Sequence, residues 1–124
     1  DWSSDVFSSD LADVIERVWY PGLESHPGHD IAARQMHGGF GGVLSVQLAG
    51  GAEAAKKFVD YTEIFTLAES LGGVESLIEV PAAMTHASVA GTTLQVPGNL
   101  VRISVGIENA DDLIADLKQA LDRL

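Results

Sequence analysis

The end of the chain joins a strand pattern to a helix pattern, and this pair of elements constrains the fold most strongly. Apolar and polar residues alternate over residues 100–105 (LVRISV), which indicates a strand with one buried face. Residues 110–124 then place leucine, isoleucine and alanine along one side of a helix, and Asn109 is its predicted N-cap. A helix with a single apolar face must cover another element, so we expect it to pack on a sheet that contains the strand.

Further strands and helices alternate along the rest of the chain, separated by glycine and proline. The predicted strands are residues 14–20, 43–48, 66–68 and 76–80, and the predicted helices are residues 29–37 and 52–62, with a helical turn at 81–85. None of the strands is a long, continuously apolar run, as strands covered on both faces usually are. We therefore expect an α/β fold of the α+β-like kind, a two-layer sandwich in which a small open sheet has helices on one face. The uncovered face must meet something else.

The charge balance and the residue types argue against several classes of partner. The 124 residues include 18 acidic and 7 basic side chains, a net charge of −11, which disfavours nucleic acid and anionic membrane surfaces. The chain has no cysteine, so we expect neither a disulfide nor a zinc–thiolate site, and a reducing, cytoplasmic location is the natural expectation. No apolar run approaches the roughly 20 residues that a membrane-spanning helix needs.

Residues 1–11 (DWSSDVFSSDL) differ from the rest of the chain because they are rich in serine and aspartate and show no sustained apolar period. They are predicted to be a disordered leader, and a native and a non-native origin both stay open. Residues 12–124 are predicted to form one domain, since the chain is long and apolar enough for a single core. Because the chain begins with Asp1 rather than methionine, we expect it to be a piece of a longer protein.

Two polar features within the apolar pattern are candidates for chemistry. Arg102 occupies the middle of the predicted strand at 100–105, where a guanidinium group must find an anion. That anion is either an acidic residue of the same fold or the carboxylate of a ligand, and the pattern leaves both open. Residues 70–77 (SLGGVESL) contain two glycines that let the backbone approach a ligand closely, although a plain turn would use the same residues.

Both features lie in segments that resemble a known family. SLGGVESLIEVPAAMTHASV and LVRISVGIENADDLIADLKQAL are similar to the Cys/Met-metabolism family of pyridoxal-phosphate (PLP) enzymes, in its cystathionine gamma-synthase and gamma-lyase branch. The resemblance extends over residues 14–124 and includes WYPGLESHPGHDIAARQM and GGFGGVLSVQL, whereas residues 1–11 match nothing in the family. It implies the C-terminal domain of a fold-type I PLP enzyme, with residues 12–124 as the substrate-recognition domain.

The resemblance also implies roles for three residues. Arg102 matches the arginine that binds the α-carboxylate of the amino-acid substrate, and Ser76 matches the residue whose backbone helps to position that carboxylate. Glu75 matches the acidic residue that faces the distal part of cystathionine. The implied reaction is gamma-replacement on an O-acylhomoserine by cysteine, with gamma-elimination of cystathionine as the alternative. A stand-alone amino-acid-binding module is an alternative of another class.

The implied cofactor is pyridoxal 5′-phosphate, which reacts after forming a Schiff base with an amine that a lysine supplies. Lys56, Lys57 and Lys118 all fall on predicted solvent-facing helix surfaces, and none stands in the family's Ser-x-Thr-Lys motif. We therefore predict no catalytic or cofactor-binding residue in this chain and no activity of the chain alone. The expected partners are the amino-acid substrate and an upstream cofactor domain, and the resemblance implies that the parent protein is a homotetramer.

Other polar residues carry weaker signals. His26 and His29 are three residues apart, but the proline and glycine between them favour a structural loop, and we predict no metal site. The glycine cluster at 38–42 lacks the spacing of a phosphate-binding loop and is predicted to allow close packing. His86 is predicted to be a polar residue near the pocket rather than a catalytic base.

Overall fold

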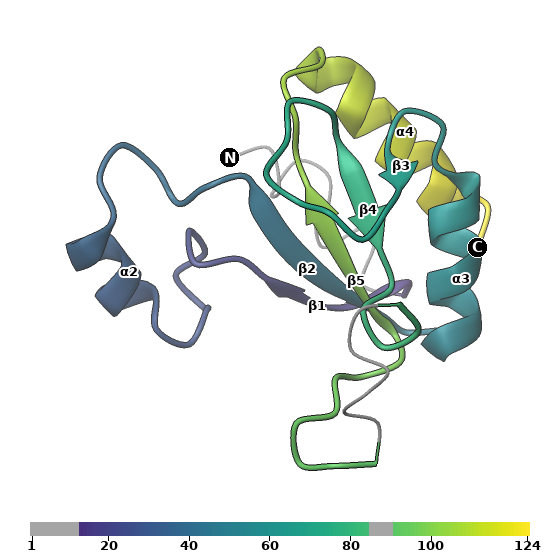
Figure 1. Ribbon diagram of the computed structural model, residues 1–124, viewed down its shortest axis with the longest axis horizontal. Helices are drawn as coiled ribbons and strands as arrows, with labels where there is room; N and C mark the ends of the chain where they lie inside the picture. Colours follow the sequence, from purple (N-terminus) through teal and green to yellow (C-terminus); the bar gives the residue numbers. More distant parts are fainter. Residues whose placement is uncertain (1–12, 85–90) are drawn as a thin grey trace.

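The computed structural model describes residues 13–84 and 91–124, and Figure 1 shows how their elements are arranged. In chain order the elements are β1 (Ile15–Trp19), α2 (His29–Gln35), β2 (Val43–Leu48), α3 (Gly51–Tyr61), β3 (Thr66–Leu67), β4 (Leu77–Glu79), β5 (Leu100–Ser104) and α4 (Ala110–Asp122). Each predicted strand and helix has a counterpart close to its predicted bounds. Residues 81–84 form a turn in which the Met84 N–H donates to the Val80 carbonyl oxygen. The predicted leader at 1–11 and His86 lie outside the described residues.

The sheet has five strands in the order β1-β2-β5-β4-β3, so β5 is its central strand. Neighbouring strands are antiparallel except β3 and β4, which are parallel. The register places Ser45 of β2 and Glu79 of β4 on either side of Arg102 in β5. The mid-strand arginine is therefore flanked by paired strands on both sides.

Helices α3 and α4 lie together on one face of the sheet, and this arrangement confirms the predicted α/β sandwich (Figure 1). Phe58 of α3 and Leu117 of α4 are fully buried in one core with Val46, Val101 and Ile103 of the sheet. These strand residues alternate with residues that point to the other face, as the two-residue period of a strand requires. Burial of such apolar side chains, at roughly 25 cal/mol per Å², is the main term that stabilises the sandwich.

Helix α2 projects away from this sandwich, on the long connection between β1 and β2 (Figure 1). None of its residues is buried, and Ile31 is 50% exposed, so its weak apolar pattern does not reach the core. No helix in the described ranges, α2 included, is long and apolar enough to cross a membrane.

The glycines that follow α2 correct one prediction. Close packing is wrong for Gly38 and Gly39, because no atom lies within 4 Å of where their side chains would begin. Their φ angles of +80° and +147° require glycine instead. Close packing does hold at Gly42, where an added Cβ would lie 3.3 Å from the Val105 carbonyl oxygen.

A buried carboxylate on α4 fixes the connection between α3 and β3. Asp116 is 5% exposed and accepts hydrogen bonds from the main-chain N–H groups of Glu63, Ile64 and Phe65 at 2.8, 2.8 and 3.2 Å. The side chain of Gln119 on the same helix donates to the carbonyl oxygen at the end of α3. The last helix is therefore joined directly to the turn that leads into β3.

We expect Asp116→Ala to lower the free energy of unfolding by about 3 kcal/mol, because three N–H groups would lose a charged acceptor. Asp122→Ala, at an exposed position of the same helix, is the matched control and should change stability by less than about 0.5 kcal/mol. Urea unfolding followed by circular dichroism measures both values. Equal stabilities for the two variants would contradict the anchoring role of Asp116.

Candidate functional site

The face of the sheet away from α3 and α4 carries a row of polar side chains across four strands. Trp19 of β1 is opposite Ser45 of β2, Ser45 is opposite Arg102 of β5, and Arg102 is opposite Glu79 of β4. Residues that are directly opposite one another in a sheet share a face. An indole, a hydroxyl, a guanidinium and a carboxylate group therefore lie in one line across the open face.

Arg102 and Glu79 form an ion pair within this row. Arg102 Nη2 lies 2.5 Å from Glu79 Oε2, and the two side chains are 16% and 1% exposed. Although these two atoms are in contact, neither Glu79 carboxylate oxygen has a hydrogen bond within the described residues. The interaction is therefore an electrostatic ion pair. The sequence left two possible anions for Arg102, an acidic residue of the same fold or the carboxylate of a ligand. The structure shows the first of these, Glu79.

The same guanidinium group holds the segment between β3 and β4. Arg102 Nη2 donates to the carbonyl oxygens of Glu69 and Ser70 at 3.3 and 3.2 Å. Two residues further along β5, Ser104 Oγ accepts a hydrogen bond of 2.8 Å from the Gly72 N–H. The segment at 69–72 is therefore tied to β5 along its length. Both hydrogen bonds of the guanidinium group with the described residues use Nη2, and Nε and Nη1 make none with them.

Ser76 is tied to the turn after β5 through the carboxylate of Glu108. Its N–H donates to Glu108 Oε2 at 2.9 Å, and its hydroxyl donates to Glu108 Oε1 at 2.8 Å. Ser76 Oγ also accepts from the Gly106 N–H at 2.8 Å, and the Ser76 carbonyl oxygen accepts from the Thr66 N–H at 3.0 Å. The residue is fully buried, and each of its polar groups has a partner within the chain. A direct contact of Ser76 with substrate stays a prediction.

Glu108 was not among the residues singled out from the sequence. Its bonds to Ser76 lower its pKa below the usual 4.5, and the main-chain N–H is the largest cause, followed by the hydroxyl. Desolvation acts in the opposite direction and is the smaller effect. The signal available in the sequence was its position in LVRISVGIE, the motif that contains Arg102.

Glu75 lies between two fixed main-chain positions and is itself exposed. On one side the Val74 carbonyl oxygen accepts from the Ile107 N–H at 2.9 Å, and on the other side Ser76 is bound to Glu108. The Glu75 carboxylate has no hydrogen bond or ion pair to any described residue. Ser76 and Arg102 thus each belong to a set of polar contacts that holds part of the 69–76 segment, and the Glu75 side chain is exposed to solvent.

A hollow of about 290 Å³ lies on the open face beside Arg102. It is lined by Trp19, Ser45, Gln47, Pro97 and Leu100. Trp19 Nε1 donates to Gln47 Oε1 at 2.7 Å, which fixes the indole in the wall. Ser45 is the direct cross-strand neighbour of Arg102. The hollow therefore lies on the β2 side of Arg102, whereas the contacts of the guanidinium group lie on the β4 side.

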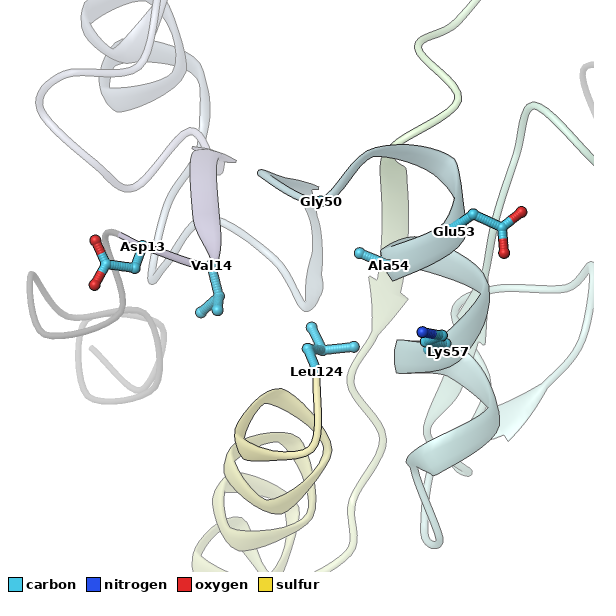
Figure 2. Close-up of a pocket in the computed structure, with 7 residues that line it drawn as sticks. All are labelled: Asp13, Val14, Gly50, Glu53, Ala54, Lys57 and Leu124. Carbon is cyan, nitrogen blue, oxygen red and sulfur yellow. The ribbon is translucent and has the colours of Figure 1, made fainter.

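A second cavity, of about 280 Å³, lies where the start of β1 meets α3 and the end of α4 (Figure 2). Val14, Ala54 and Leu124 point toward its middle, whereas the carboxylates of Asp13 and Glu53 point away from it (Figure 2). Its inner surface is therefore apolar.

The lysines of the chain do not fit the cofactor that the resemblance implies. A Schiff-base lysine must stand against the cofactor inside a site that also binds a phosphate group. Lys56 is 61% exposed and pairs with Glu53 at 3.9 Å, and Lys57 and Lys118 are exposed as well. Lys57 borders the cavity of Figure 2, but Asp13 and Glu53 border it too and would repel a phosphate. None of the three lysines therefore has the surroundings of a Schiff-base lysine, and the absence of cofactor-binding residues from this chain stays a prediction.

His26 and His29 make local contacts between β1 and α2. His29 Nδ1 lies 2.7 Å from the Pro21 carbonyl oxygen, and the His26 ring packs edge-on against Trp19 with centroids 6.1 Å apart. Within residues 13–84 and 91–124, no group of three or more His, Cys, Asp or Glu side chains could hold a metal ion.

Comparison with known proteins shows which family the chain matches. Residues 8–122 match the family described as Cys/Met metabolism PLP-dependent enzyme. The chain is 61% identical over 108 residues to the cystathionine gamma-synthase of Mycobacterium leprae, which covers 87% of this chain and 28% of that protein. It is 49% identical over 122 residues to the cystathionine gamma-lyase of Saccharomyces cerevisiae, which covers 95% of this chain and 31% of that protein.

A solved structure is similar over nearly the whole chain. The crystal structure of metB from Corynebacterium glutamicum has a TM-score of 0.88 and 55% identity, over 98% of this chain and 32% of that one. The chain therefore spans less than a third of the length of these proteins. The family match begins at residue 8, inside the predicted leader at 1–11, and that domain boundary stays a prediction.

The lowered pKa of Glu108 gives the fold a specific pH dependence. A depressed folded-state pKa stabilises the fold above the unfolded value of 4.5, and this stabilisation is lost as pH falls through the folded value. We expect Glu108→Gln to be less stable than the unmodified chain at neutral pH, and the difference to shrink below about pH 4.5. Urea unfolding from about pH 7 to about pH 3 measures this, with Glu63→Gln, an exposed acid, as the control. A difference that does not change with pH would rule out the ionised carboxylate as its source.

Proposed function

The chain belongs to the Cys/Met-metabolism family of PLP-dependent enzymes, and we propose that it is the substrate-recognition part of a cystathionine gamma-synthase. Such an enzyme joins cysteine to an O-acylhomoserine by gamma-replacement. The observation that carries the proposal is Arg102, which lies on the central strand of the open face and whose Nε and Nη1 have no hydrogen bond to the described residues. Two charge-assisted hydrogen bonds from a guanidinium group would hold a substrate α-carboxylate in a single orientation.

The partners of Nη2 support this role because they fix the guanidinium group before a ligand arrives. Glu79 contacts Nη2 from β4, and the carbonyl oxygens of Glu69 and Ser70 accept from the same nitrogen. A group that is already ordered loses less conformational entropy on binding. The carboxylate of a substrate would therefore bind a guanidinium group whose orientation is already fixed.

Glu75 is the proposed contact for the distal part of the substrate. Its carboxylate is exposed and has no partner among the described residues. An unpaired carboxylate attracts an ammonium group, such as the amino group of cysteine or the distal amino group of cystathionine. Glu75 and Arg102 would then recognise charges of opposite sign, at the two ends of cystathionine or on the two separate substrates of gamma-replacement.

Other parts of the protein complete the proposed enzyme. When it is bound, PLP supplies the electron sink that gamma-replacement needs, and we assign its binding to residues outside this chain. The proposed partner is a cofactor domain of the same protein that meets the open face of the sheet, and the whole protein is proposed to be a homotetramer. The chain alone would have no activity, and a cytoplasmic location stays a prediction.

A cystathionine gamma-lyase is the second candidate, because the similarity to the yeast gamma-lyase extends over 95% of the chain. Arg102 and Glu75 would serve both reactions in the same way. The higher identity to the Mycobacterium leprae gamma-synthase favours replacement over elimination. Assays of the full-length protein for cystathionine formation and for 2-oxobutanoate release distinguish the two activities.

In the full-length protein we expect Arg102→Lys to raise the KM for the O-acylhomoserine roughly 10- to 100-fold, because one charge-assisted hydrogen bond is lost. Lysine keeps a positive charge beside Glu79, so the buried carboxylate is not left alone. Arg34→Lys, at an exposed position of α2, is the matched control and should leave the KM unchanged. Steady-state kinetics measure both, and equal KM values for the two variants would count against Arg102 as the carboxylate contact.

The isolated chain should show no saturable rise in melting temperature with cysteine or cystathionine, because part of the site lies elsewhere in the protein. A stand-alone amino-acid-binding module would show the opposite result. Thermal unfolding over a range of ligand concentrations separates the two cases. A saturable shift that Arg102→Lys removes would overturn the enzyme-part proposal in favour of the module.

A further inference from the structure

Residues from two distant segments form one hydrogen-bonded unit, which we call the Glu108 clasp: Val74, Ser76, Gly106, Ile107 and Glu108. Two of its bonds run from Ser76 to the Glu108 carboxylate, between residues 32 positions apart in the sequence. The other two join the Gly106 N–H to Ser76 Oγ and the Ile107 N–H to the Val74 carbonyl oxygen. The clasp therefore fastens the chain on both sides of Glu75 to the turn between β5 and α4.

The clasp is closely packed at its centre. A Cβ on Gly106 would overlap the Val74 carbonyl oxygen and would lie 2.6 Å from both Glu108 Oε1 and the main-chain carbon of Glu75. Apolar packing does not fix this segment, because Leu71 and Val74 are 53% and 71% exposed. The main chain on either side of Glu75 is therefore held by the polar bonds of the clasp, in which Glu108 is the charged member.

We propose that Glu108 is a positioning residue for substrate recognition, which fixes the main chain of Val74–Ser76 and thereby aims the Glu75 side chain at the distal part of the substrate. The inference rests on the proposed function, which gives Glu75 that contact. Both carboxylate oxygens of Glu108 bind Ser76, so the role proposed for it is to hold the main chain and not to contact the substrate. A carboxylate suits this position because it accepts from two donors at once, whereas an amide has one accepting oxygen.

Two roles of the clasp can be distinguished: it either only stabilises the fold or also positions Glu75. They differ in whether the effect of replacing Glu108 depends on Glu75. If Glu108 only stabilised the fold, its replacement would have the same effect whether or not Glu75 is charged. If Glu108 acts through Glu75, its replacement should have little effect on KM in a variant that has already lost the Glu75 charge. A double-mutant cycle on KM separates the two cases.

The experiment compares the full-length enzyme with E75Q, E108Q and the double variant, and with E63Q as an exposed control. The measured quantity is the KM for the substrate with the distal amino group, cysteine in replacement or cystathionine in elimination. We expect E108Q to raise this KM roughly 5- to 20-fold with kcat within about twofold, as loss of substrate binding requires. In the E75Q background, E108Q should change the KM by less than about twofold.

Equal effects of E108Q in both backgrounds would overturn the positioning role. If E75Q and Arg102→Lys leave every KM unchanged, the proposed function itself fails. If those two variants raise KM and E108Q does not, only the present inference fails. Should E108Q not fold, Ser76→Ala enters the same cycle, since it keeps the main-chain bond to Glu108 and loses the two hydroxyl bonds, to Glu108 and from the Gly106 N–H. A smaller rise in KM that disappears with E75Q supports the role, and a rise that persists with E75Q overturns it.

Discussion

Strand β5 pairs with β2 and β4 at once, and this position divides the protein into a core and an open polar face. Val101 and Ile103 point into the core under α3 and α4, and Arg102 lies opposite Ser45 and Glu79 on the other side of the sheet. Because side chains alternate along a strand, a shift of one residue in register would place the guanidinium in the core. The pairing that builds the core therefore also places the candidate carboxylate contact.

The Arg102–Glu79 pair is difficult to explain by stability alone. Removing two charges from water costs free energy that their attraction often fails to recover, and a well-packed apolar pair is frequently as stable or more stable. Glu79 is almost completely buried and has no hydrogen bond within the described residues. A pair that adds little to stability can still restrict the direction of a guanidinium group. The position of this pair at the centre of the open face supports the proposed role of Arg102 in orienting a substrate.

Local sequence patterns predicted the helices and strands of the fold, but they could not predict the long-range polar contacts. Periods of two and of 3.6 residues are properties of short segments, so β5 and α4 were predictable to within a few residues. The bond between Ser76 and Glu108 spans 32 residues, and the bonds from Asp116 to the turn after α3 span more than 50. No local period encodes such a contact. For the same reason the sequence showed that Arg102 needs an anion but could not identify Glu79.

Local patterns also misjudged positions where no partner lies nearby. The apolar residues of α2 predicted a helix, and the helix is present, but Ile31 stays exposed because α2 lies away from the sandwich. Gly38 and Gly39 were predicted to serve packing, whereas their backbone angles are the reason that glycine fits there. A sequence pattern shows which faces are apolar, and the tertiary arrangement decides which of them are covered.

The segment that carries Glu75 is held by hydrogen bonds and contributes little to the apolar core. The residues that would recognise the substrate are therefore separate from those that stabilise the fold. Residues 69–75 are all exposed, and they are fastened by bonds to Arg102, Ser104 and the Glu108 clasp. A substitution at Glu75 would therefore change the chemistry offered to a substrate without opening a cavity in the core. The chain is similar both to a gamma-synthase and to a gamma-lyase over most of its length. Because Arg102 and Glu75 would serve both reactions in the same way, one rigid framework is a physical basis on which both activities could use the same fold.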